Sequence, residues 1–151
     1  MTTIVSDLKM MVSDSRVSVD SDNPKVDDYI FSANKIYQKK DAIIGCCGSN
    51  EDIESFVKWY SSRHKKPKII DKEFAALVLT QKGLFHYDST LSKDKVNDKF
   101  AAIGSGGNAA LGALHMGADL VRSVEIAMLV DKHSGPPIQI VKLNNDEIPS
   151  V

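Results

Sequence analysis

The chain has little cysteine, no long apolar run and no excess charge of either sign. Its only two cysteines, Cys46 and Cys47, are adjacent. Neighbouring side chains of a strand point to opposite faces, so this pair does not readily form a disulfide, and we expect a reducing compartment. No stretch approaches the roughly 20 apolar residues that span a bilayer, and the N-terminus lacks a basic leader followed by an apolar segment. These absences predict a cytoplasmic protein without a membrane partner.

Nucleic acid is also a poor candidate for a partner. The 19 Lys and Arg residues are balanced by 20 Asp and Glu residues, so the formal net charge is -1 and no overall positive field attracts a phosphate backbone. At 151 residues, with 42% hydrophobic and 26% charged residues, the chain has the composition of an ordinary globular protein. We expect a single domain over residues 1–151.

Patterns typical of metal or nucleotide sites are missing as well. The four histidines are scattered without a metal-ligand spacing, and the glycine-rich segment 104–107 fits neither G-x-G-x-x-G nor a P-loop. We therefore expect no metal and no cofactor.

Hydrophobic periodicity predicts many short strands and three helices. Ile53, Phe56, Val57 and Tyr60 lie at helical spacing, with Ser49 or Asn50 placed to cap the helix. The predicted helices span residues 51–62, 108–116 and 120–130, and the predicted strands span residues 2–5, 10–12, 29–31, 35–38, 42–47, 74–80, 84–87, 100–103 and 138–143. Residues 13–28 are rich in Ser, Asp and Asn, and their composition by itself assigns no strand to this segment. This grouping favours an α+β layered domain with largely antiparallel sheets.

Thr2 is the first residue that suggests chemistry. Its small side chain permits an aminopeptidase to remove Met1, after which the hydroxyl and the free α-amine belong to one residue. An α-amine has an ordinary pKa of about 8, so it can accept the hydroxyl proton near neutral pH.

A cysteine nucleophile is the rival hypothesis. Neither cysteine has a recognisable Cys–His context, and the apolar strand around them is typical of buried, inert thiols.

Six short motifs in a fixed order extend this argument. They are TTIV (2–5), SDSR (13–16), KIY (35–37), GCCG (45–48), GSGG (104–107) and DKHSG (131–135). Together they resemble the proteasome β-subunit and HslV family of N-terminal nucleophile hydrolases, over nearly the whole chain. The resemblance implies a four-layer αββα sandwich of the N-terminal nucleophile hydrolase type and a threonine peptidase activity.

By this resemblance Thr2 is the nucleophile, and Asp14 and Lys35 are the acid and base that flank it. An ammonium at Lys35 stabilises a developing alkoxide, and a carboxylate at Asp14 keeps that lysine charged and oriented. Taken without the motif order, the two residues are more typical of a surface ion pair. Gly48 matches the glycine whose N–H faces the scissile carbonyl oxygen, although it also serves as a strand terminator.

The remaining matches are supporting residues. Ser105, Asp131 and Ser134 match the residues that surround the terminal amine in the family. Ser18 matches a residue on the strand that pairs with extended substrate. Cys46 falls near the position that lines the pocket for the residue preceding the cut, and Cys47 competes with it for that place.

The resemblance also fails in places. The family has two long helices between the strand that ends at Gly48 and the following hairpin, whereas only residues 51–62 are helical here, so we expect one outer helix to be missing. We expect the protein to act on unfolded polypeptide or peptides within a homo-oligomeric ring fed by an ATPase unfoldase. The alternatives are a non-catalytic assembly subunit of the same fold and an amidohydrolase that uses the same threonine on a small amide.

Overall fold

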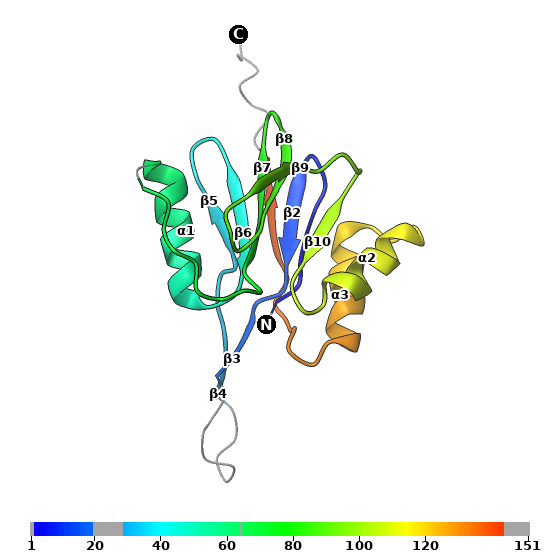
Figure 1. Cartoon of the computed structure of the whole chain (residues 1–151). Helices are drawn as coiled ribbons and strands as arrows, with labels where there is room; N and C mark the ends of the chain where they lie inside the picture. The colour runs from blue at the N-terminus through cyan, green and yellow to red at the C-terminus, as the bar shows by residue number, and fades with distance from the viewer. Residues whose placement is uncertain (1, 20–28, 64, 144–151) are drawn as a thin grey trace.

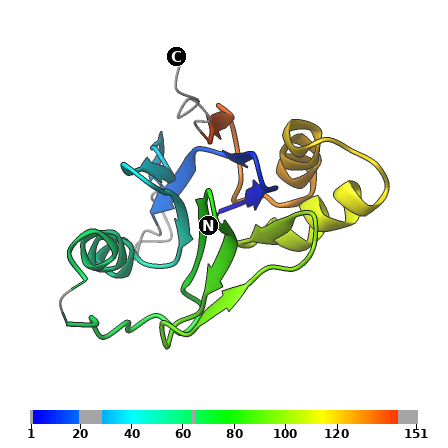
Figure 2. The same cartoon turned by 90° about the horizontal axis from the view of Figure 1, so that it is seen from above.

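The structure, a computed structural model of the chain, describes residues 2–19, 29–63 and 65–143. These residues form four layers: one helix, two antiparallel sheets and a pair of helices (Figure 1). Seen from above, the two sheets lie between the two helical layers (Figure 2). The αββα architecture predicted from the sequence is therefore confirmed. No helix in the described part of the chain is long and apolar enough to cross a bilayer.

The first sheet carries the start of the chain. Its strand order is β10 (Ala101–Ile103), β1 (Ile4–Ser6), β2 (Met10–Ser13) and β11 (Gln139–Lys142), with every neighbour antiparallel. Helices α2 (Gly107–His115) and α3 (Leu120–Val130) cover its outer face. Val5 and Val12 are fully buried between this sheet and the two helices, so the β1–β2 hairpin forms one wall of the core.

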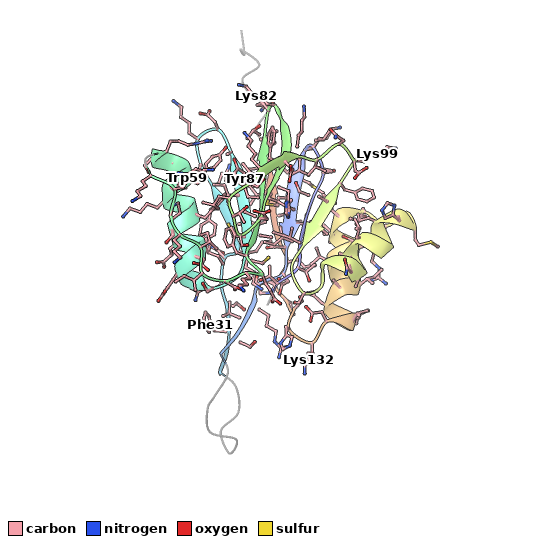
Figure 3. The ribbon with its side chains drawn as sticks, viewed as in Figure 1. Phe31, Trp59, Lys82, Tyr87, Lys99 and Lys132 are labelled. Atoms are coloured by element: carbon pink, nitrogen blue, oxygen red, sulfur yellow. The ribbon has the colours of Figure 1, made fainter. Side chains whose placement is uncertain are left out.

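The second sheet contains both cysteines. Its strand order is β5 (Ile36–Gln38), β6 (Ile43–Cys47), β7 (Ala75–Thr80), β8 (Gly83–Tyr87) and β9 (Lys93–Lys95), again all antiparallel. Helix α1 (Asn50–Ser62) covers its outer face, and the Ser49 hydroxyl caps the helix by accepting a hydrogen bond from Asp52 N at 3.3 Å. Trp59 and Tyr87 face each other between helix and sheet (Figure 3).

Two strands differ from the expectation. Strand β3 (Arg16–Val19) lies in the segment to which composition assigned no strand, where only the match of Ser18 implied one, and it pairs with β4 (Tyr29–Ser32) in a separate two-stranded ribbon. Strand β9 was also missed, because its three residues are all exposed and charged and carry no apolar alternation. Strand β9 is therefore defined by its pairing with β8 and not by buried surface of its own.

A single helix covers the outer face of the second sheet in the described residues, as predicted. The connection from α1 to β7 is held by Asp52, which is 3% exposed. Its two carboxylate oxygens accept hydrogen bonds from Ile70 N at 3.1 Å and Asp71 N at 2.8 Å. This contact returns the chain to the end of β6, beside Gly48.

We predict that Gly45→Ala lowers the free energy of unfolding by about 1–3 kcal/mol, because its new Cβ would lie 2.7 Å from Met11 Sδ and 2.8 Å from Ile4 Cγ2 between the sheets. The matched control is Gly112→Ala in α2, where a Cβ meets no atom within 4 Å. That change is expected to stabilise the protein by about 0.5–1 kcal/mol. Urea unfolding of both variants measures the difference, and equal effects would contradict the tight inter-sheet packing.

Candidate active site

Thr2 lies two residues before the start of β1 and is only 7% exposed. Its backbone nitrogen donates to the Ser105 hydroxyl at 3.2 Å, and its carbonyl accepts from Gly106 N at 3.3 Å. Gly104 has a φ of 96°, and a Cβ at this position would overlap the Thr2 carbonyl. Only glycine therefore allows the 104–107 loop to lie directly against Thr2.

The Asp14 and Lys35 side chains form a buried ion pair beside Thr2. Lys35 Nζ lies 2.9 Å from Asp14 Oδ1 and 3.1 Å from Oδ2, and the two residues are 7% and 0% exposed. Asp14 Oδ1 also accepts from Thr3 N at 3.0 Å, which connects the pair to the backbone next to Thr2. Burial lowers the pKa of the Lys35 amine below its ordinary value, while the Asp14 carboxylate opposes that change.

A second carboxylate, Asp131, is linked to Thr2 through Ser105. The hydroxyls of Ser105 and Ser134 donate to Asp131 Oδ2 at 2.6 and 2.7 Å, and His133 N donates to Oδ1 at 3.2 Å. Partial burial alone would raise the pKa of this carboxyl, but the three hydrogen bonds outweigh it and hold the pKa below its ordinary value. The Ser105 hydroxyl donates its single proton to Asp131, so the Ser105 oxygen accepts the hydrogen bond from the Thr2 nitrogen.

Thr3 completes this network, and sequence reasoning did not single it out. Its hydroxyl lies 2.7 Å from the Ser134 hydroxyl. Since Ser134 gives its proton to Asp131, the Thr3 hydroxyl is the donor. No local pattern distinguishes Thr3 from any other strand threonine, so only the fold reveals this contact.

A pocket of about 480 Å³ opens at Thr2. Gly48 and Cys47 line it from the end of β6, and Ser105 lines it from the glycine-rich loop. Gly48 is exposed and has a φ of 130°, so its backbone turns sharply at the pocket wall. Asp71 and Glu73 are further lining residues that no sequence motif identified.

Three sequence-predicted binding residues occupy different places. Cys47 lines the pocket at Thr2, whereas Cys46 is 2% exposed and packs in the core layer beneath α1. Burial raises the pKa of both thiols, that of Cys46 well above its ordinary value, so neither is an activated nucleophile. Ser18 lies in β3 opposite Ile30 and does not line the pocket.

Comparison with known proteins places this geometry in a recognised fold. No family model matches the chain, and no curated protein matches its sequence. Solved structures do match, and they show that this chain shares its fold with HslV and with the structures of BPH and Anbu.

Three of these structures illustrate the likeness. Eukaryotic HslV from Trypanosoma brucei matches with a TM-score of 0.73 and 21% identity over 95% of this chain and 99% of that chain. BPH from Thiobacillus denitrificans matches at 0.64 and 19%, over 96% and 99% of the two chains. The Anbu (Gly-1) mutant from Hyphomicrobium sp. strain MC1 matches at 0.68 and 14%, over 95% and 82%. At these identities the comparisons establish the fold alone.

We predict that Asp131 makes stability sensitive to acid. Its folded pKa is depressed, so its contribution is present above the unfolded pKa of about 4 and is lost as the pH falls through the folded value. Asp131→Asn should therefore flatten the fall in the free energy of unfolding below about pH 4. Urea unfolding at several pH values tests this against Asp98→Asn, which removes an exposed carboxylate. Identical pH profiles for wild type and Asp131→Asn would refute the role of the network.

Proposed function

We propose that the chain is a threonine peptidase in which Thr2, exposed as the first residue after removal of Met1, is the nucleophile. The observation that carries the proposal is the environment of Thr2 and its neighbour. The Thr2 nitrogen bonds to Ser105, which is bound to Asp131, and the adjoining Thr3 N–H bonds to the Asp14–Lys35 pair. The HslV-like fold and the solved complex of BPH from Thiobacillus denitrificans with epoxomicin support the same class of hydrolase.

The proposed reaction proceeds through an ester on Thr2. The hydroxyl attacks the substrate carbonyl while the Thr2 α-amine accepts its proton, and the Gly48 N–H donates to the oxyanion. The peptide C–N bond then breaks, and the leaving amine takes the proton. A water molecule, deprotonated by the same α-amine, attacks the ester; the acid product departs and the hydroxyl is restored.

The other residues tune this chemistry. A positive charge on Lys35 favours the developing alkoxide and lowers the pKa of a neighbouring α-amine, and Asp14 orients the lysine. Ser105 holds the Thr2 nitrogen by accepting its hydrogen bond. Asp131 orients Ser105 by accepting a hydrogen bond from its hydroxyl, and Ser134 donates to the same carboxylate oxygen. We assign Ser18 and Cys47 to the substrate, because β3 has one strand edge without a partner among the described strands and Cys47 lines the pocket.

A covalent epoxyketone tests the nucleophile, because its two electrophilic carbons require a hydroxyl and an amine on one residue. Intact-mass measurement should show loss of Met1 and one adduct per chain. Thr2→Ala, which still permits loss of Met1 and keeps the amine, should form no adduct, and Thr2→Ser should retain it. Lys35→Ala should slow adduct formation by about 100- to 1000-fold, whereas Lys9→Ala, on the surface, should not.

The outcomes of this experiment separate the alternatives. An adduct on Thr2→Ala would refute Thr2 as nucleophile. A wild-type chain that loses Met1 but forms no adduct would favour a non-catalytic assembly subunit of the same fold. An adduct together with hydrolysis of small amides but not of peptides would favour an amidohydrolase.

We predict that the peptidase prefers a basic side chain next to the cleaved bond. Asp71 and Glu73 are the charged residues that line the pocket at Thr2, and no lysine or arginine lines it. Peptide libraries varied on both sides of the cut should show higher kcat/KM for Lys or Arg than for Glu. Asp71→Asn/Glu73→Gln should reduce that ratio by about tenfold, and the matched surface variant Asp94→Asn/Asp98→Asn should leave it unchanged. A preference for acidic residues in the wild type would contradict this.

We also propose a homo-oligomeric ring in the cytoplasm that degrades unfolded polypeptide delivered by an ATPase unfoldase. Enclosure protects other proteins from a broadly reactive threonine. Large apolar side chains remain exposed on the α2–α3 layer: Met116 at 88%, Leu129 at 80% and Val130 at 71%.

Light scattering should give a mass several times that of the 16.5 kDa chain. Leu129→Lys/Val130→Lys should reduce that mass by placing charges on the exposed apolar surface, and Lys99→Glu/Lys132→Glu should not. An active wild-type monomer would exclude compartmentalisation.

A further inference from the structure

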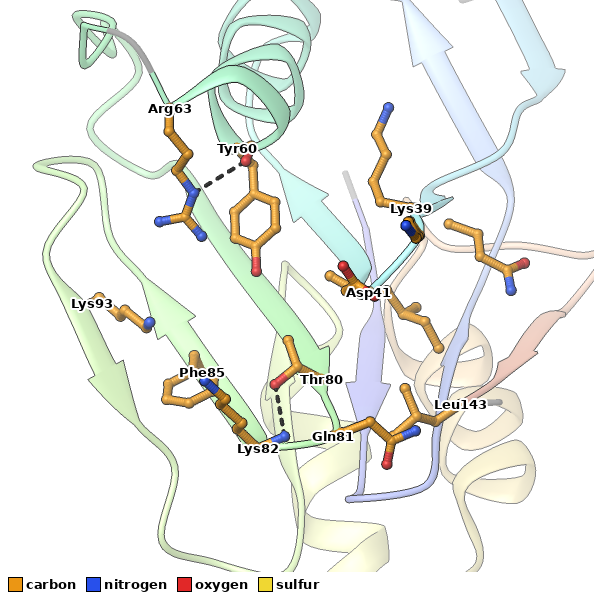
Figure 4. Close-up of a pocket in the computed structure, with 14 residues that line it drawn as sticks. Lys39, Asp41, Tyr60, Arg63, Thr80, Gln81, Lys82, Phe85, Lys93 and Leu143 are labelled. Atoms are coloured by element: carbon orange, nitrogen blue, oxygen red, sulfur yellow. Dashed lines mark hydrogen bonds between the residues drawn. The ribbon is translucent and has the colours of Figure 1, made fainter. Parts of the chain in front are cut away.

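A second hollow has a volume of about 700 Å³ (Figure 4). The β5–β6 and β7–β8 turns that line it lie at the end of the sandwich opposite the N-terminus (Figure 1). It forms where the β5–β6 turn, the β7–β8 turn and the end of α1 meet, with β9 and Leu143 on its sides. Its volume is within the range of small-molecule sites. None of its lining residues belongs to the pocket at Thr2.

The hollow concentrates positive charge in a chain whose net charge is -1. Five cations line it, against the single carboxylate of Asp41: Lys39, Lys40, Arg63, Lys82 and Lys93. Among the described residues the ion pairs are Lys35–Asp14 and Arg122–Glu125, so none of these five cations is neutralised by a carboxylate partner. Their charges therefore add at the hollow.

Arg63 is held in place at the edge of the hollow by contacts that leave its charge free. It ends α1 with a φ of 56°, a conformation in which glycine is the usual residue. Its guanidinium lies 4.4 Å from the Tyr60 ring centroid, and its Nε donates to the Tyr60 carbonyl at 3.2 Å (Figure 4). The two terminal nitrogens have no hydrogen-bond partner in the described structure and can bind an anion in a bidentate manner.

A second cation is positioned in the same way. Lys93 Nζ lies 4.4 Å from the Phe85 ring centroid on the facing side of the hollow. Lys82 lies at the β7–β8 turn, where its backbone N–H donates to the Thr80 hydroxyl at 3.1 Å (Figure 4). Cations on three separate elements thus surround one space, an arrangement suited to an anion with several linked charges.

We propose that this hollow binds linked phosphate groups, carried either by a nucleotide or by inorganic polyphosphate. Arginine and lysine together provide the bidentate and point-charge contacts that phosphates require. The rings of Tyr60 and Phe85 provide apolar surface beside the cations, against which a nucleobase can lie. A site of this kind is independent of the peptidase chemistry, because it shares no lining residue with the pocket at Thr2.

Isothermal titration of the full chain with ATP, tripolyphosphate and adenosine tests the proposal. ATP and tripolyphosphate should bind and adenosine should not, with affinity falling as ionic strength rises. Tighter binding of ATP than of tripolyphosphate identifies a nucleotide as the source, and equal or weaker binding identifies polyphosphate. Arg63→Gln/Lys82→Gln should weaken binding by at least about tenfold. The control Lys99→Gln/Lys132→Gln removes the same charge outside the hollow and should bind as wild type does (Figure 3).

Arg63→Gly separates binding from folding. It removes the guanidinium but relieves the positive φ, so thermal stability should be unchanged or higher while phosphate binding weakens. The proposal is overturned if neither ATP nor tripolyphosphate binds, or if the control variant loses as much affinity as Arg63→Gln/Lys82→Gln. Binding of an acidic peptide without binding of either phosphate compound also overturns it, because the hollow is then a protein-docking site.

Discussion

The site depends on one buried carboxylate, Asp14. A fully buried charge is tolerated only when hydrogen bonds and an opposite charge replace its water shell. Asp14 obtains these from Lys35 Nζ and from the backbone N–H groups of Thr3, Arg16 and Gly135. The donors come from the residue before β1, the first residue of β3, the residue before β5 and the loop after α3. Satisfying this one group therefore brings the start of the chain, the segment before β5 and the loop after α3 together beside Thr3.

The carboxylate of Asp131 is also stabilised by hydrogen bonds, and here the side-chain donors are hydroxyl groups. Asp131 accepts from Ser105 and Ser134, and these in turn contact Thr2 and Thr3. Both carboxylates hold the residues before β1: Asp14 accepts directly from Thr3 N, and Asp131 acts through Ser105 and Ser134. The Thr2 region is thus fixed by polar contacts that lie at the end of the two sheets, while the apolar layers hold those sheets together.

The charge of the protein is also distributed along the sandwich. Asp71 and Glu73 line the pocket at the Thr2 end, and the five cations of the second hollow gather at the opposite end. The short connection after α1, held by Asp52, is what places Asp71 beside Gly48. A net charge of -1 conceals this separation, because the opposite charges cancel in the sum.

Much of the architecture was determined by local sequence. The spacing of Phe56 and its neighbours specified α1, alternation specified most strands, and motif order indicated the αββα sandwich and the candidate residues around Thr2. The tertiary structure decided which of two capping residues begins α1, that Cys47 rather than Cys46 reaches the pocket, and that Thr3 joins the Asp131 network. It also revealed the pairing of β3 with β4, and the strand β9, whose three charged residues have no apolar face. Periodicity records which side of an element is buried, whereas the partner that a buried polar group finds depends on how distant segments pack.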